Sequence, residues 1–160
     1  MSITCNKPKT IRVPMGGLKF AEPPDVLETL LGSCVGIAIW DERSGCGGLA
    51  HAVLPDSQGK VASPGKFVDT AVLHLKQQLV EQGASEYSLR AKVAGGSIMF
   101  GKGTETIGTR NCEAALHHLK QQNIRVVAEH LGGDKGRVIR FSLKDQSVEV
   151  EMGRKIIGVI

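Results

Sequence analysis

Residues 29–55 read TLLGSCVGIAIWDERSGCGGLAHAVLP, and this stretch carries the strongest structural signals in the chain. Residues 35–40 are a short apolar run rich in β-branched side chains, which is typical of a strand buried on both faces. Residues 41–47 supply turn-forming side chains and glycines, and residues 48–54 form a second apolar run. Two such runs joined by a short turn predict a β-hairpin.

The sequence around this hairpin predicts two helices and further strands. The first helix opens at Ser63-Pro64-Gly65, carries apolar residues at three- and four-residue spacing, and ends before Gly83. The second runs from near Ile107 to about Gln122. The other predicted strands are 10–14, 26–31, 88–94, 124–128, 137–143 and 148–151, with 17–20 left open between strand and loop. We therefore expect an α/β domain around one mixed, largely antiparallel sheet, because several connections are too short for parallel crossovers.

The composition is that of one ordinary globular domain spanning residues 1–160. Apolar residues make up 41% of the chain and charged residues 22%, which excludes a disordered or fibrous protein. The net charge is +4, but the lysines and arginines are scattered, and only four Phe, one Tyr and one Trp are available to stack on bases. Nucleic-acid binding is therefore not expected.

We expect neither a metal nor any other cofactor. The glycine-rich segments at 95–97 and 101–104 lack the spacing of a phosphate-binding loop. The four cysteines include no CxxC pair and no zinc-finger spacing to histidine: Cys5, Cys34, Cys46 and Cys112. The longest apolar run has seven residues, so membrane insertion is not expected. With no signal-peptide pattern at the N-terminus, the expected location is the reducing cytoplasm.

Cys34 and His51 are the candidate catalytic residues. Cys34 follows Gly32-Ser33 at the start of the first buried strand, and His51 lies among apolar neighbours in the second. If the strands pair, the imidazole can reach the thiol and take its proton, because the thiolate is the nucleophile. Backbone N–H groups of the turn, including that of Cys34, are candidates to face a developing oxyanion. This chemistry is acyl transfer: attack on a carboxamide, loss of ammonia and hydrolysis of a thioester.

The residues alone leave a structural alternative open. A buried cysteine at the start of a strand is usually a small hydrophobe, and a histidine in an apolar strand is usually a hydrogen-bonded core residue. Periodicity predicts the two strands, but it does not predict that the two side chains meet.

Several motifs extend beyond the hairpin. In chain order they are Leu31-Gly-Ser-Cys34-Val-Gly36, Ala50-His51-Ala-Val-Leu-Pro55, Pro64-Gly-Lys-Phe-Val-Asp-Thr-Ala71, Lys92-Val-Ala-Gly-Gly-Ser-Ile-Met-Phe100, Ile107-Gly-Thr-Arg-Asn111 and Gly132-Gly-Asp-Lys-Gly-Arg137. With these motifs in order over roughly residues 10–152, the chain closely resembles the CheD family of chemoreceptor glutamine deamidases.

The resemblance implies a fold, a reaction and partners. The fold is a three-layer α/β/α sandwich, similar to the catalytic domain of cytotoxic necrotizing factor toxins. In the reaction, Cys34 attacks the side-chain amide of selected chemoreceptor glutamines and converts them to glutamate, with His51 as its base. The partners are the cytoplasmic helical bundle of a chemoreceptor, as substrate, and in some systems a CheC-type phosphatase.

A third residue is expected to orient His51. Many members of the resembled family carry a threonine six residues before the cysteine, where this chain has Glu28. Thr29 is one position later, and neighbouring strand residues face opposite ways. Thr29 is therefore expected to need a bulge or a shifted register to take this role. Thr29 is preferred, and Glu28 is the alternative.

The leading hypothesis is a monomeric protein-glutamine deamidase, with ester hydrolysis on methylated receptor glutamates as a side activity. A glutamine on a helical bundle requires a shallow groove, for which the candidate substrate-binding residues, on family analogy, are Ser33, Gly95, Gly96 and Ser97. One alternative is a binding module that regulates a CheC-type phosphatase. Another is a redox-sensing protein in which Cys34 is reversibly oxidised.

Overall fold

The computed structural model describes residues 7–60, 62–99 and 106–160. In chain order its elements are β1 (Thr10–Arg12), β2 (Leu18–Ala21), β3 (Val26–Leu31), β4 (Val35–Asp41), β5 (Gly47–Ala52), α1 (Val68–Glu81), the 3₁₀ turn η1 (Glu86–Ser88), β6 (Leu89–Gly95), α2 (Ile107–Gln121), β7 (Arg125–Leu131), β8 (Arg137–Ser142), β9 (Val148–Met152) and β10 (Lys155–Val159). In this described part, the strands form an outer sheet ordered β1-β3-β8-β9-β10 and a central sheet ordered β2-β5-β4-β6-β7. Neither of the described helices is long and apolar enough to cross a membrane.

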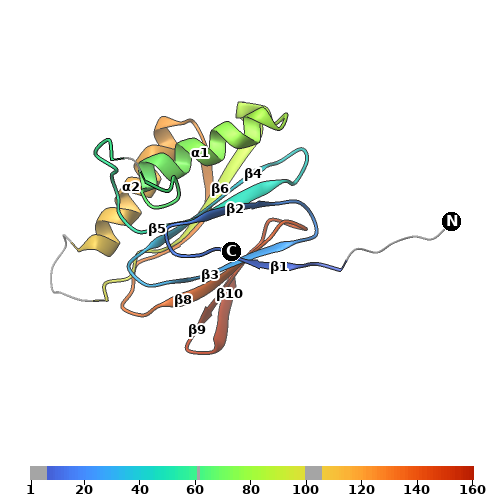
Figure 1. Cartoon of the computed structure of the whole chain (residues 1–160). Helices are drawn as coiled ribbons and strands as arrows, with labels where there is room; N and C mark the ends of the chain where they lie inside the picture. Colours follow the sequence, from blue (N-terminus) through green and yellow to red (C-terminus); the bar gives the residue numbers. More distant parts are fainter. Residues whose placement is uncertain (1–6, 61, 100–105) are drawn as a thin grey trace.

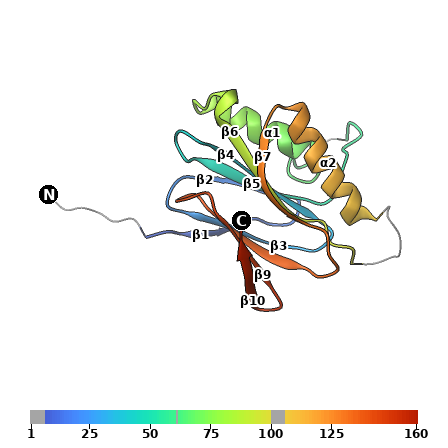
Figure 2. The same ribbon diagram turned by 180° about the vertical axis from the view of Figure 1, so that it is seen from behind.

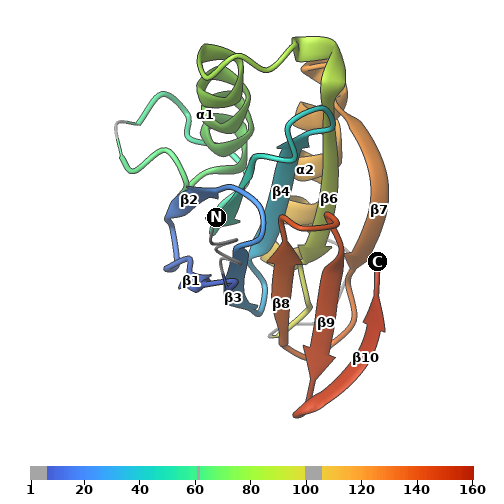
Figure 3. The same ribbon diagram turned by 90° about the vertical axis from the view of Figure 1, so that its right-hand side faces the viewer.

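The two sheets pack against each other, and both helices cover the opposite face of the central sheet (Figures 1 and 3). Strand β4 shows how this arrangement is built, because every one of its residues is buried. Val35, Ile37 and Ile39 pack in the core beneath the helices. Trp40 points the other way and meets Phe141 of the outer sheet, with the ring centroids 5.8 Å apart. The continuous apolar run predicted from the sequence is therefore a strand between two cores.

The expected α/β/α sandwich around one sheet is wrong, since the layers are helices, central sheet and outer sheet. Strand β3 pairs with β8, and β8 pairs with β9, instead of joining the sheet of the hairpin. These three strands alternate buried residues with more exposed ones, which is the pattern of a sheet with one face open to water. Seen from the opposite direction, both helices again lie on one side of the two sheets (Figure 2).

The hairpin, both helices and the mixed, largely antiparallel pairing are confirmed. β4 and β5 form an antiparallel ladder, and among the described strands only β1–β3 and β6–β7 are parallel. Of the segment 17–20, left open by the sequence, residues 18–20 lie in β2 at the edge of the central sheet. Strand β10, which the sequence did not predict, is an exposed edge strand of the outer sheet.

Candidate active site

The β4–β5 ladder brings Cys34 and His51 to one corner of the central sheet. His51 lies directly opposite Gly36, which follows Cys34 by two residues. Cys34 belongs to the core between the two sheets, and His51 contacts the outer sheet from the same face. Cys34 lies one residue before β4, just beyond the last rung of the ladder, so both residues lie at the same corner of the central sheet. Both are buried, with exposed fractions of 7% for Cys34 and 3% for His51.

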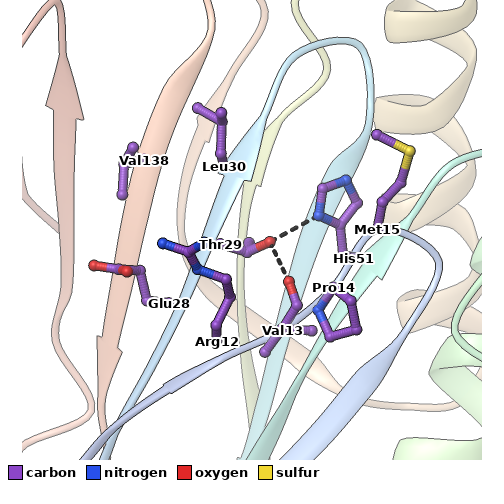
Figure 4. A pocket seen from close by; sticks show the side chains of 9 residues that line it. All are labelled: Arg12, Val13, Pro14, Met15, Glu28, Thr29, Leu30, His51 and Val138. Carbon is purple, nitrogen blue, oxygen red and sulfur yellow. Dashed lines mark hydrogen bonds between the residues drawn. The ribbon is translucent and has the colours of Figure 1, made fainter.

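Thr29 contacts His51 from the outer sheet. Its Oγ1 lies 2.7 Å from Nδ1 of His51 and donates its proton to the carbonyl oxygen of Val13 at 2.8 Å (Figure 4). A hydroxyl has only one proton, so the bond to His51 must be donated by Nδ1–H and accepted by Oγ1. This fixes the tautomer, with the proton on Nδ1 and a free lone pair on Nε2.

The free nitrogen of His51 is available as a base. Nε2 is buried and has no hydrogen-bond partner among residues 7–60, 62–99 and 106–160. In Figure 4 this nitrogen points away from Thr29. A buried lone pair without a partner is unfavourable, and the thiol of Cys34 at the same corner is the candidate donor to it.

Burial keeps both members of the pair neutral. It lowers the pKa of His51 below the ordinary imidazole value, because the charged ring is poorly solvated. It raises the pKa of the Cys34 thiol for the same reason, and the backbone N–H of Cys34 opposes this rise in part. In both groups burial thus favours the neutral form.

Glu28, the alternative to Thr29, points to the opposite face of β3 from Thr29. Its carboxylate accepts a 2.7 Å hydrogen bond from Nε of Arg140 on the outer surface of the sheet. The β3–β8 ladder runs without interruption, so the bulge expected for Thr29 is absent from it. Thr29 shares the inner face of β3 with Leu27 and Leu31, and regular alternation alone brings it to His51.

A cavity of about 360 Å³ lies beside Thr29 and His51 (Figure 4). Two exposed apolar side chains, Met15 and Leu30, stand at its rim. Cys34 is not part of its wall, so the cavity reaches the imidazole from the Thr29 side. The rest of its lining consists of Arg12, Val13, Pro14, Glu28 and Val138.

The candidate substrate-binding segment does not form an open wall. Gly95, Gly96 and Ser97 are all buried, and Ser97 is completely inaccessible. The N–H of Gly96 donates to the carbonyl of Cys34 at 2.8 Å, and that of Ser97 donates to the carbonyl of Gly32 at 2.9 Å. This segment braces the turn that holds the thiol, so the expectation that it lines a groove is wrong. Ser33 is partly exposed beside the thiol.

The other cysteines and histidines lie in different surroundings. Cys46 and Cys112 are free thiols of intermediate exposure, whereas Cys5 and the segment 101–104 lie outside the described residues. The guanidinium of Arg137 donates to the backbone carbonyl of His130 and contacts Nδ1 of its ring. Within the described ranges, no three His, Cys, Asp or Glu side chains are grouped so that they could hold a metal ion.

Sequence reasoning missed one group of the site. The carbonyl of Val13 accepts the proton of Thr29 and so determines the tautomer of His51. A backbone carbonyl is present at every residue, so no residue type marks this role.

A buried cysteine and a buried histidine at one corner of a sheet, with Nδ1 of the histidine bonded to a hydroxyl, are the residue types that a cysteine-dependent acyl-transfer enzyme requires. A family model described as CheD chemotactic sensory transduction matches residues 53–152. The chain belongs to the CheD family.

Individual relatives agree with this family. A protein of Methanococcus maripaludis named "Probable chemoreceptor glutamine deamidase CheD" is 44% identical over 149 residues, which cover 91% of this chain and 97% of the relative. A Thermotoga maritima protein named "Chemoreceptor glutamine deamidase CheD" is 41% identical over 147 residues, covering 91% of this chain and 92% of the relative. The family-model match begins after His51, but an alignment covering 91% of the chain spans both Cys34 and His51.

Proposed function

We propose that this protein is a chemoreceptor glutamine deamidase, with Cys34 as nucleophile, His51 as general base and Thr29 as the residue that orients His51. The observation that carries the proposal is the 2.7 Å contact between Nδ1 of His51 and Oγ1 of Thr29, which leaves Nε2 unprotonated and, among the described residues, without a hydrogen-bond partner. The names of the family members supply the substrate, a glutamine side chain of a chemoreceptor.

The reaction proceeds through a thioester. Nε2 of His51 takes the thiol proton as Sγ of Cys34 bonds to the amide carbon, and the carbonyl electrons move to oxygen. The tetrahedral intermediate collapses with cleavage of the C–N bond, and the nitrogen takes the proton from Nε2 and leaves as ammonia. Water then attacks the thioester and gives a proton to Nε2. Sulfur leaves with that proton, and the product is glutamate.

The oxyanion of this intermediate needs a hydrogen-bond donor close to the sulfur. The backbone N–H of Cys34 interacts with its own thiol and lowers its pKa in part. It is therefore positioned near the atom at which the intermediate forms, and it is the candidate oxyanion donor. Thiol, imidazole, water and this N–H complete the reaction, so the mechanism calls for no cofactor.

The surface around the site suits a glutamine displayed on a receptor helix in the cytoplasm. Met15 and Leu30 are exposed on the side of His51. The exposed side chain of Met99 lies near Gly32, 3.5 Å from where a Cβ added to this glycine would lie. These side chains provide apolar contacts around the thiol, and apolar contacts of this kind suit the surface of a helical bundle.

The test is mass spectrometry of a chemoreceptor cytoplasmic fragment after incubation with the protein. We expect specific glutamine peptides to gain the mass of an amide-to-acid conversion and ammonia to appear in equal amount. If the receptor fragment from the same organism stays unchanged while a CheC-type phosphatase is bound, the protein is a regulatory binding module and the deamidase proposal fails. Methylated fragments in the same assay report any esterase activity.

Replacing Thr29 by valine is expected to lower kcat by roughly 10- to 100-fold, the rate equivalent of one buried hydrogen bond. Valine keeps the shape and β-branching but offers no acceptor to Nδ1–H, so the tautomer with free Nε2 loses its preference. Thr29→Ser keeps the hydroxyl and is expected to retain most activity. Steady-state kinetics of both variants check this. A Thr29→Val enzyme with unchanged kcat would show that Thr29 only fills space.

A further inference from the structure

Helix α2 carries a polar side chain on its buried face. Its buried residues are Gly108, Asn111, Ala115 and Leu119, and Asn111 is completely inaccessible to solvent. A carboxamide in the interior is unfavourable unless hydrogen bonds replace its lost contacts with water. The partners of Asn111 therefore indicate why a polar residue occupies an apolar position.

Both partners of Asn111 lie close in sequence to the candidate catalytic residues. Its Nδ2 donates to the carbonyl oxygens of Ser33 and Val53, each at 3.0 Å. Ser33 immediately precedes Cys34, and Val53 follows His51 by two residues. One amino group thus holds the segment that carries the nucleophile and the strand that carries the base.

These two bonds lie where the backbone ladder ends. The last β4–β5 pair joins Val35 to Ala52, so the next position outward is that of Cys34 and Val53. Asn111 therefore acts just beyond the last rung and bonds the two segments to one another where the ladder no longer does.

Asn111 is itself held in place by its helix. The first turn of α2 rests directly on the segment after β6, where a Cβ added to Gly108 would lie 2.3 Å from the carbonyl oxygen of Ser97. In the same segment the N–H of Gly96 donates to the carbonyl of Cys34. The carbonyl of Ser33 is thus bonded to α2, and the carbonyl of Cys34 is bonded to the segment on which α2 rests.

The orientation of the amide is determined by its neighbours. Both groups that face Nδ2 are carbonyls, which can only accept, so Nδ2 must be the atom that faces them. Oδ1 is buried without a hydrogen-bond partner in the described part of the chain. The fold retains an unpaired acceptor while both donors of Asn111 remain on the two strands.

We propose that Asn111 is a positioning residue, which sets the separation between Sγ of Cys34 and Nε2 of His51 by bonding to the carbonyls of Ser33 and Val53. This inference rests on the proposed deamidase function and adds a residue to it. A misplacement of about 1 Å in a reacting pair can cost on the order of 10²-fold in rate.

The test compares Asn111→Leu, which keeps the size but loses both bonds, with Leu119→Ala, a core truncation farther along α2. We expect Asn111→Leu to lower kcat on a receptor fragment by about 10²-fold with little change in KM. Leu119→Ala is expected to lower the melting temperature while kcat stays near wild type. In a double-mutant cycle, Asn111→Leu combined with His51→Gln is expected to be no slower than His51→Gln alone, because both act on one proton transfer.

A second readout does not depend on receptor deamidation. The pH dependence of Cys34 alkylation by iodoacetamide is expected to shift to higher pH in Asn111→Leu, since the displaced imidazole no longer accepts the thiol proton. If the wild-type protein deamidates no receptor, the proposed function fails, while the alkylation profile still decides the role of Asn111. Unchanged kcat and alkylation, or losses that simply add to those of His51→Gln, would overturn the proposal. If Asn111→Leu does not fold, Asn111→Ser removes the same bonds without added bulk.

Discussion

Replacing Cys34 by alanine is expected to stop glutamine deamidation, with kcat falling on the order of 10⁶-fold, as for other nucleophiles that act within a catalytic unit. Without the thiol no thioester forms, and His51 retains only the ability to activate water. The fold is expected to survive, because losing one small buried side chain typically costs about 1 kcal/mol. Receptor-peptide mass spectrometry measures the first effect and thermal melting the second.

The matched control for this prediction is Cys46→Ala. It makes the same chemical change at the turn of the same hairpin, where the carbonyl of Cys46 accepts the N–H of Asp41. This variant is expected to keep full activity. Hydroxylamine added during turnover should intercept the thioester as a hydroxamate with wild-type protein and not with Cys34→Ala. Deamidation that persists in Cys34→Ala would mean that water attacks the amide directly and that Cys34 is only a core thiol.

The sequence was sufficient for both helices and for every described strand except β10 and β2, which was left open, but not for the layers they form. The apolar run of β4 and the amphipathic pattern of both helices are local properties, so periodicity identifies them. The partner of each strand depends on contacts that are distant in sequence. A usable signal was nevertheless present, because Val148 to Glu151 alternates strictly between apolar and acidic residues. A strand with one solvent-exposed face cannot lie in a sheet that helices cover on both sides.

The candidate site was predictable only where it depends on one hairpin. Cys34 and His51 lie on neighbouring strands joined by a short turn, so their proximity follows from local pairing. Thr29 comes from the other sheet. The count of residues back from Cys34 led to the wrong expectation that its side chain needs a bulge or a shifted register to reach His51. Gly32 and Ser33 form a bend between β3 and β4, and strand alternation does not continue through a bend.

Replacing His51 by glutamine is expected to lower kcat about 10²–10⁴-fold at neutral pH, which is the usual contribution of a general acid–base. Glutamine is polar and similar in length, but it cannot take the proton of Cys34 or return it to the departing nitrogen. His74→Gln is the control, because His74 lies on α1 with its ring beside Phe20 and is expected to be replaceable without loss of activity.

The pH profile separates a catalytic His51 from a structural one. Burial lowers the pKa of His51, so the wild-type enzyme should remain active through neutral pH and lose kcat/KM only below the ordinary imidazole value of about 6.5. Activity falls on that side because protonated Nε2 can no longer accept the thiol proton. In His51→Gln the break below about 6.5 should disappear, and activity should instead climb steadily with pH as hydroxide generates the thiolate. Since the pKa of Cys34 is raised, the climb should continue beyond the ordinary thiol range. An unchanged break in this pH range in His51→Gln would assign the base to another group and leave His51 as a buried partner of Thr29.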